Sequence, residues 1–295
     1  MSRAGRWQVE DWSDAGRDQL LALHREILRL STARGDMFAV LALPAGWQAE
    51  SALEHLASLR TGGGSAVDVG DGFSLPLGDA ESGAFTQGAL YHPWPVRRDP
   101  EGALRRVPPD GAMAGLIADR SLKRGAWIAP ANDALQDLVA LEPALPAEAW
   151  QSLQDAQLNF LRQDPGGFRC LAADTLSSDP ELHPINVRRL LHLLRRAALR
   201  LGATYVFEPM NDAFIRTVHH AFENLMLHLF ARGALAGRSP ADSFQVNTGP
   251  SVNPPESREL GRFIVEIKVA PALPRRFLTL RLVQTGDRAT VSETQ

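Results

Sequence analysis

One continuous apolar run most narrowly limits the fold that this chain can adopt. Residues 37–43 read Met-Phe-Ala-Val-Leu-Ala-Leu, and the run ends at Pro44. A run without polar alternation is typical of a strand that is buried on both faces of a helix-covered sheet. Apolar residues at helical spacing precede it over 14–30 and follow it over 52–59. The order helix, strand, helix predicts an α/β fold with a mixed sheet flanked by helices.

Helical and strand patterns alternate again in the last third of the chain. The expected elements there are helices at 187–201 and from Asp212, and strands at 204–207, 263–269 and 277–284. The last two strands alternate apolar and polar residues, which indicates a sheet with one buried face. The predicted domains are 1–184 with a loop-rich stretch at 61–83, a smaller α+β domain at 185–284, and a flexible tail at 285–295.

Composition excludes several classes of protein. The 295 residues include 31 basic and 34 acidic side chains, a net charge of −3, so the basic excess of a dedicated nucleic-acid binder is missing. The single cysteine, Cys170, excludes a disulfide within the chain and a cysteine zinc cluster. No stretch approaches the ~18 apolar residues of a membrane helix, and the polar first residues lack a signal-peptide core. We expect a protein that folds in the cytosol and does not insert into a membrane.

The residues that could carry catalysis or bind a metal lack the required surroundings. The glycine run at 62–64 has no P-loop lysine, and neither GxSxG nor GxGxxG occurs. His219 and Glu223 have metal-ligand spacing on one helix, but no HExxH is present, and a solvated face explains them. Cys170 lies in an apolar strand and is expected to be an inert buried thiol. We therefore predict no catalytic residue, no cofactor and no metal; a degenerate α/β hydrolase is the alternative that serine-reactive probes would test.

Arginine is concentrated on one side of the helix expected at 187–201. The residues concerned are Arg188, Arg189, Arg195, Arg196 and Arg200. One interpretation is a solvated amphipathic face. The other is a surface that pairs with acidic groups of a neighbouring protein, because guanidinium groups bind carboxylates in bidentate fashion.

Seven short stretches carry a family resemblance, and they follow one another in the family's order. They are ALYHPW (89–94), VPPDGAMAG (107–115), RGAWIAPAN (124–132), INVRRL (185–190), VFEPMND (206–212), GALAG (233–237) with FQV (244–246), and the proline-rich stretch at 270–277. They resemble the "ALYYPW", "VPPSGHVAG", "RGVWKAPAN", "INVRRL", "VFEPND", "GALxG…AFxV" and "APVRPAEFV" motifs of tail sheath proteins from contractile phage tails and contractile injection systems.

The resemblance implies a sheath core that is subtilisin-like in fold only, followed by a C-terminal sheath domain. It implies a non-enzymatic subunit of stacked six-fold rings around an inner tube, whose contraction drives the tube through a target envelope. Chain arms of such subunits add strands to neighbouring copies. The implied partners are other sheath subunits, the inner tube protein, and baseplate and terminator proteins. The particle would be assembled in the bacterial cytoplasm, as part of a virion tail or a released or membrane-docked device.

The same resemblance marks structural positions and suggests contacts between subunits. The motif positions are Tyr91, Pro93, Trp94, Pro108, Pro109, Gly111, Gly115, Trp127, Pro130, Asn132, Phe207, Glu208, Pro209, Asn211, Ala270, Pro271 and Pro274. The expected subunit interface comprises Arg188, Arg189, Arg195, Arg196, Phe277, Leu278, Leu280 and Leu282. On this interpretation, reversing the charges of Arg188 and Arg189 impairs assembly and leaves the fold intact.

Three departures from the family pattern favour a second hypothesis. FRCLAADTL (168–176) replaces "WGARTL", and Arg275-Arg276 replaces the "AE" that precedes Phe277. The family's N-terminal arm ("PGVYVEE") has no obvious counterpart. The alternative is therefore a sheath-like cap, baseplate or adaptor protein of the same apparatus that does not polymerise.

Overall fold

The computed structural model describes residues 14–61, 79–205, 208, 210–271, 278–285 and 288–294. They form two compact units. The N-terminal unit contains the described residues up to 123 and residues 129–185, and the C-terminal unit contains 124–128 and the residues from 186 onward. The sequence assigned 124–128 to the first domain, whereas this short stretch groups with the C-terminal unit. None of the helices in the described ranges combines the length and apolarity needed to span a membrane.

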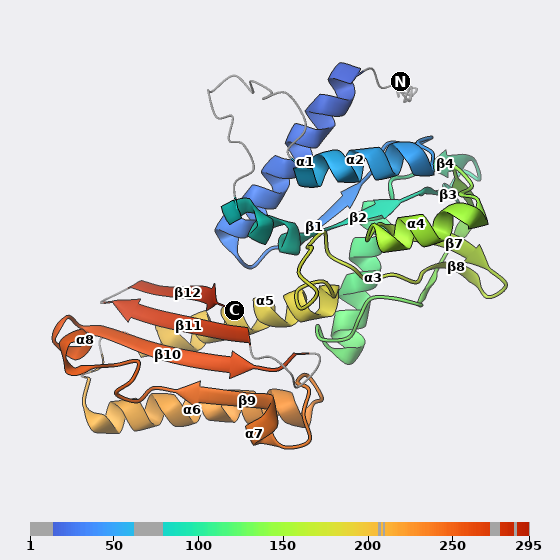
Figure 1. The fold of residues 1–295 in the computed structure, drawn as a ribbon. Coiled ribbons are helices and arrows are strands. Elements are labelled where there is room, and N and C mark those ends of the chain that lie inside the picture. Colours follow the sequence, from blue (N-terminus) through green and yellow to red (C-terminus); the bar gives the residue numbers. More distant parts are fainter. Residues whose placement is uncertain are drawn as a thin grey trace, which may run out of the picture. The chain divides into compact units, whose positions relative to one another are not determined.

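The N-terminal unit is built on a five-stranded mixed sheet (Figure 1). The strand order is β1 (Ala39–Ala42), β2 (Gly88–His92), β7 (Asn159–Asp164), β8 (Gly167–Cys170) and β5 (Ala134–Leu135). β1, β2 and β7 run parallel, whereas β8 is antiparallel to both of its neighbours.

Helices cover both faces of this sheet. They are α1 (Asp14–Arg34), α2 (Ala49–Thr61), α3 (Pro109–Arg124) and α4 (Trp150–Asp155). Leu90 of β2 is buried in a core with apolar residues of α1, α2 and α4. Its neighbour Tyr91 is buried in a second core with Met113 of α3. Since β2 buries side chains on both faces, the predicted α/β fold with a helix-flanked mixed sheet is confirmed.

Smaller elements complete this unit. They are the 3₁₀ helices η1 (Asp79–Gln87) and η2 (Ala147–Ala149) and a small antiparallel sheet in the order β4 (Leu104–Arg106), β3 (Trp94–Arg98) and β6 (Leu138–Glu142). Pro93 separates β2 from β3, and Pro95 lies within β3. It is tolerated near the start of the strand, and its carbonyl accepts a hydrogen bond from the Val107 amide at 3.0 Å.

The C-terminal unit combines a four-stranded antiparallel sheet with helices (Figure 1). The strand order is β12 (Arg288–Thr294), β11 (Leu278–Thr285), β10 (Arg262–Val269) and β9 (Phe244–Asn247). The helices are α5 (Ile185–Ala203), α6 (Asp212–Ala231), α7 (Pro240–Ser243) and α8 (Pro255–Glu259).

The two long helices pack on one face of this sheet. Leu282 and its cross-strand partner Val265 are both buried on that face. The Phe214 ring of α6 meets the Phe263 ring of β10 edge to face, with centroids 5.4 Å apart. Gly202 of α5 lies against Leu282, since an added Cβ there would come within 3.1 Å of Leu282 Cδ2.

Two details of the C-terminal prediction are wrong. The expected loose tail contains β12, which pairs with β11 over its whole length. Val291 of this strand is buried on the helix-covered face. The expected strand at 204–207 begins instead as a turn that follows α5, with Tyr205 bonded back to Gly202. Val206 and Phe207 lie outside the described residues.

The close approach of Gly237 to Ser243 and Asp242 can be tested by substitution. Its φ of +126° belongs to a region that L side chains rarely adopt, and an added Cβ would overlap Ser243 Oγ and lie 3.2 Å from the carbonyl carbon of Asp242. We expect Gly237→Ala to lower the free energy of unfolding by about 3 kcal/mol, through strain and overpacking together. Chemical denaturation followed by circular dichroism measures it.

Gly233→Ala is the matched control. Gly233 also has a positive φ, +73°, but nothing lies within 4 Å of an added Cβ. Its expected cost is only the left-handed backbone penalty of about 1 kcal/mol. Equal losses for the two variants would show that the contact with Ser243 and Asp242 contributes nothing.

Candidate functional site

The residues considered for catalysis or metal binding make separate contacts and do not form one site. Burial raises the pKa of the Cys170 thiol to about 12, and the thiol donates to the Ala172 carbonyl at 3.3 Å. His219 Nδ1 lies 3.2 Å from Thr248 Oγ1, whereas Glu223 pairs with His220 at 3.4 Å. Among the described residues, no group of three or more His, Cys, Asp or Glu side chains is arranged to hold a metal ion. The glycine run at 62–64 lies outside those residues.

The carboxyl ends of β1 and β2 are tied to the loop that follows β1. In parallel sheets, ligands commonly bind at this edge. Here the Trp94 Nε1–H donates to the Leu43 carbonyl at 2.6 Å, and His92 Nε2 lies 2.8 Å from the Trp47 carbonyl. A carbonyl only accepts, so His92 Nε2 carries the hydrogen. The turn at 89–94 therefore acts as a structural tie between two strands.

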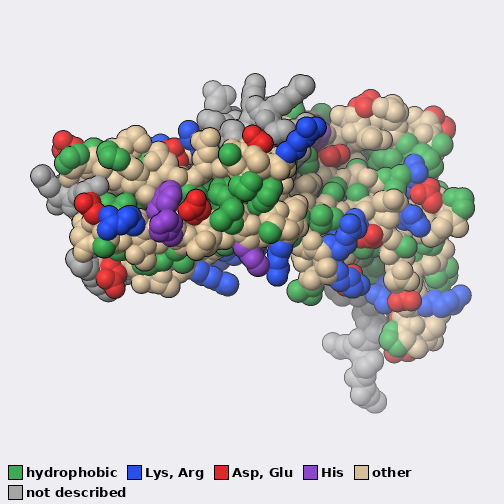
Figure 2. All heavy atoms as spheres, turned by 90° about the horizontal axis from the view of Figure 1, so that it is seen from below, with side chains coloured by type: hydrophobic (Ala, Val, Ile, Leu, Met, Phe, Trp, Pro, Cys, Tyr) green, Lys and Arg blue, Asp and Glu red, His purple; other side chains and the backbone are tan. Residues whose placement is uncertain are grey.

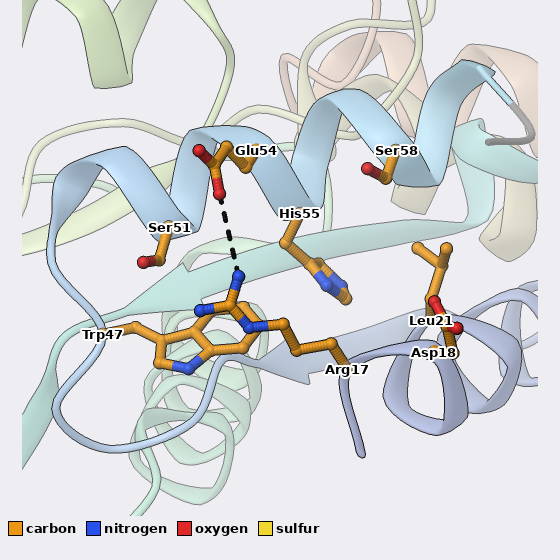
Figure 3. A pocket seen from close by; sticks show the side chains of 8 residues that line it. All are labelled: Arg17, Asp18, Leu21, Trp47, Ser51, Glu54, His55 and Ser58. Carbon is orange, nitrogen blue, oxygen red and sulfur yellow. Dashed lines mark ion pairs between the residues drawn. The ribbon is translucent and has the colours of Figure 1, made fainter. Parts of the chain in front are cut away.

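A pocket of about 270 Å³ lies between α1 and α2 (Figure 3). Its lining residues are Arg17, Asp18, Leu21, Trp47, Ser51, Glu54, His55 and Ser58. The Arg17 guanidinium stacks over the Trp47 ring at 5.3 Å and lies 3.8 Å from the Glu54 carboxylate (Figure 3). Arginine over an indole face is a favourable cation–π arrangement.

This pocket is lined by serine, histidine and acidic residues, the residue types of a serine hydrolase, but its histidine is not suited to act as a general base. His55 Nε2 is 3.1 Å from His24 Nδ1, so this ring nitrogen is engaged by a second histidine and not by a serine. Burial, followed by the charges of His24, Arg25 and Arg17, lowers the pKa of His55 to about 3. A general base works best with a pKa near the working pH. The pocket therefore gives no support to the hydrolase alternative.

The last strand of the chain is held by two arginines of α5. Arg188 Nη1 lies 2.6 Å from Glu293 Oε2, and the side chains are 2% and 28% exposed. Further along the same helix, Arg195 Nη1 donates to the Val291 carbonyl. We call the Arg188–Glu293 and Arg195–Val291 contacts the β12 clasp. Arg188 is enclosed within the C-terminal unit, and Arg195 is half-buried there.

Several residues that were predicted to lie at a subunit interface are buried within their own chain instead. Leu278, Leu280 and Leu282 are buried in the sheet of their own chain, with exposures of 5% or less. Arg189 is half-buried, and Arg196 is exposed on α5. Phe277 lies outside the described residues. Charge reversal at Arg188 is therefore expected to unfold the unit, contrary to the expectation from the sequence.

Several motif positions have local structural roles. Pro109 begins α3, the fixed φ of proline being suited to that position, and Gly111 and Gly115 lie on its exposed side. Asn132 has a φ of +63° and accepts from Arg169 at 3.1 Å. The Asn211 side chain accepts from the Phe214 amide at 2.8 Å and so caps α6.

The remaining motif positions divide by burial. Ala270 is buried and exchanges backbone hydrogen bonds with Ser243 and Ala236, both between 2.8 and 2.9 Å. Pro93 and Pro130 are buried, Trp127 and Pro271 are half-buried, and Pro108 and Glu208 are exposed. Pro209 and Pro274 lie outside the described residues, as does Phe207.

The outer side of α6 has a mixed surface. Figure 2 shows basic, acidic, histidine and apolar side chains interspersed where α6 faces the viewer. Exposed residues of α6 include Arg216, His220, Asn224 and Leu227. Interspersed charge of this kind is typical of an ordinary polar surface.

Sequence reasoning missed Glu293 and the histidine pair. Glu293 lies in the stretch that was expected to be a loose tail. The alternation of Ala289, Val291 and Glu293 on one side of that stretch was the available signal for a strand. No comparable pattern marks His24 and His55, which are 31 positions apart.

Comparison with solved structures identifies the fold. A chain of the anti-feeding prophage (AFP) baseplate superposes with a TM-score of 0.66 at 20% identity, covering 96% of this chain and 66% of that one. A chain of the contracted sheath complex of PVC, an extracellular contractile injection system, has a TM-score of 0.65 at 26% identity, covering 80% and 60%. The contracted AFP helical sheath gives 0.60 at 24% identity, covering 89% and 72%.

This chain spans 66% and 60% of the length of the first two structures. No protein-family model matches the sequence, and no curated protein matches it. The resemblance to tail sheath proteins is confirmed by these folds.

Proposed function

Because this chain has the fold of tail sheath proteins, we propose that it is a structural subunit of a contractile, phage-tail-like injection apparatus. The proposal rests mainly on the similarity to the PVC sheath chain, which is 26% identical over 80% of this chain. The seven ordered motifs support the same assignment. The role is mechanical and non-enzymatic: subunits surround an inner tube, and their rearrangement drives the tube through a target envelope.

The sheet of the C-terminal unit is the proposed connection between copies. Within the described part of the chain, β12 lies at one edge and β9 at the other, and each is bonded to a single neighbouring strand. Edge strands of this kind can pass between chains, either by adding to a free edge or by taking the place of an identical strand. We propose that copies form stacked six-fold rings through exchange of the edge strand β12. The inner tube, baseplate and terminator proteins are further proposed partners, and assembly is proposed to occur in the bacterial cytoplasm.

A cap, baseplate or adaptor role is the second candidate. A baseplate chain of the anti-feeding prophage resembles 96% of this chain, and a contracted baseplate gives a TM-score of 0.69 at 21% identity. In this role, the protein binds the end of a longer sheath and does not polymerise.

Negative-stain electron microscopy separates the two roles. We expect the purified protein, mixed with its cognate tube protein, to form rings or cylinders. The tube protein alone is the control for its own polymers. Persistent monomers with tube present would reject the main-sheath role. Binding of those monomers to one end of a full-length sheath would then establish the cap role.

A further inference from the structure

We propose that Arg188 determines which strand is accepted beside β11: the strand must carry a carboxylate at the position of Glu293, while Arg195 holds the backbone of that strand. The preferred occupant from outside the chain is residues 288–294 of a second copy. This inference rests on the proposed strand exchange between copies, and it assigns the specificity of that exchange to the β12 clasp.

The burial of Arg188 makes a carboxylate necessary. Its side chain is 2% exposed, and Glu293 supplies the charge-assisted contact at 2.6 Å. A buried guanidinium that loses its carboxylate keeps its desolvation cost without compensation. A strand with a neutral or basic residue at this position would therefore leave the buried Arg188 guanidinium without a counter-charge, whichever chain the strand came from.

The clasp also fixes the register of the strand. Glu293 pairs across the sheet with Leu280, and Val291 pairs with Leu282, so both lie on the helix-covered face. A slip by one residue turns every side chain to the other face. It would remove Glu293 from Arg188 and expose Val291. The Arg188 contact with the Glu293 carboxylate thus selects one register and one charge, whereas Arg195 binds a backbone carbonyl that any strand provides.

Besides its backbone pairing with β11, which any strand could make, β12 has few side-chain contacts that hold it in place. Val291 is its one buried side chain among residues 288–293, and Arg288, Thr290 and Ser292 are exposed. Since apolar burial is small, the Arg188–Glu293 contact contributes a large share of the discrimination between strands. A strand held in this way can leave its own chain when an identical strand from a second copy takes its place, because the incoming strand forms the same pairs with Arg188 and Arg195.

Reciprocal charge exchange tests the inference with full-length chains. One chain carries Arg188→Glu, and a second, differently tagged chain carries Glu293→Arg. Neither can form the pair within itself or with its own kind. When they are co-expressed, each strand matches the slot of the other chain. We expect copurification of the two tags at least about tenfold above that of two co-expressed parent chains, because the parent chains have no such bias toward each other.

A third variant keeps the test decisive if the single variants fold poorly. The chain with both Arg188→Glu and Glu293→Arg restores an opposite-charge pair within itself, and its thermal midpoint should return toward that of the parent. Restoration without copurification of the mixed single variants would overturn the inference, because the clasp would then stabilise the fold only. A thermal midpoint for Glu293→Ala equal to that of the parent would overturn it as well. Rings or cylinders of the parent protein would leave the sheath role standing in either case.

Discussion

Acidification is expected to destabilise the N-terminal unit progressively as the pH falls from about 6 toward 4. Three histidines of this unit are buried: His24, His55 and His92, with exposures of 3%, 6% and 0%. Burial lowers the pKa of His24 and His92 from 6.5 to about 4 and that of His55 to about 3. The neutral rings are built into the fold through the His24–His55 contact and the bond from His92 to the Trp47 carbonyl.

The sign of the effect follows from proton binding. Between the unfolded pKa of 6.5 and the folded values, the unfolded state binds more protons than the folded state, so stability falls as the pH falls. Each such histidine contributes about 1.4 kcal/mol per pH unit in that window, and three contribute about 4 kcal/mol per pH unit. Down to the folded pKa values the three windows span about 2.5, 2.5 and 3.5 pH units and together lower the stability by about 12 kcal/mol. This exceeds the stability of a domain in the lower part of the usual range of about 5–15 kcal/mol.

Circular dichroism and tryptophan fluorescence, recorded from pH 7.5 to 3.5, measure this transition. Replacing both members of the pair, His24→Leu with His55→Leu, removes two of the three titrating groups, so the midpoint should move to lower pH. The matched control is His220→Gln, because this side chain is 68% exposed and its replacement should leave the midpoint unchanged. An acid midpoint that is the same in the double variant and the parent would contradict the assignment.

Charge reversal inside the β12 clasp is the second large effect. Arg188→Glu places a carboxylate in a site that is 2% exposed and beside Glu293. Breaking a buried pair typically costs about 3–5 kcal/mol, and adding a like charge raises the cost further. We expect the C-terminal unit to lose its cooperative thermal transition, with loss of the far-ultraviolet signal of α5 and its sheet.

Two variants on the same helix separate burial from charge. Arg188→Met keeps an apolar stem and leaves Glu293 able to reach water, so its expected cost is smaller than that of Arg188→Glu. Arg196→Glu makes the same charge reversal on an exposed side chain and should change the free energy of unfolding by less than about 0.5 kcal/mol. A similar loss in Arg188→Glu and Arg196→Glu would show that net charge, not the buried pair, is responsible.

The elements of the N-terminal unit could be predicted because their signal is local. The apolar run at 37–43 contains β1, and the run that begins at Gly88 is β2, with side chains buried in both cores. The helix expected from Asp14 is α1, and in the C-terminal unit the one expected from Asp212 is α6, capped by Asn211. The spacing of apolar residues along the chain indicates which positions of an element are buried. These elements can therefore be predicted without knowing what they pack against.

The sequence alone determined the α/β class, the positions of the main helices and strands, and the family of folds, through turn motifs whose prolines, glycines and capping residues act locally. Only the tertiary structure decided which charges are buried. Arg188 and Arg196 belong to the same arginine-rich helix, yet one is enclosed and the other is exposed. The difference depends on Glu293, which lies 105 positions away. Desolvation and pairing are properties of the segments that meet in space, and helical periodicity does not contain them.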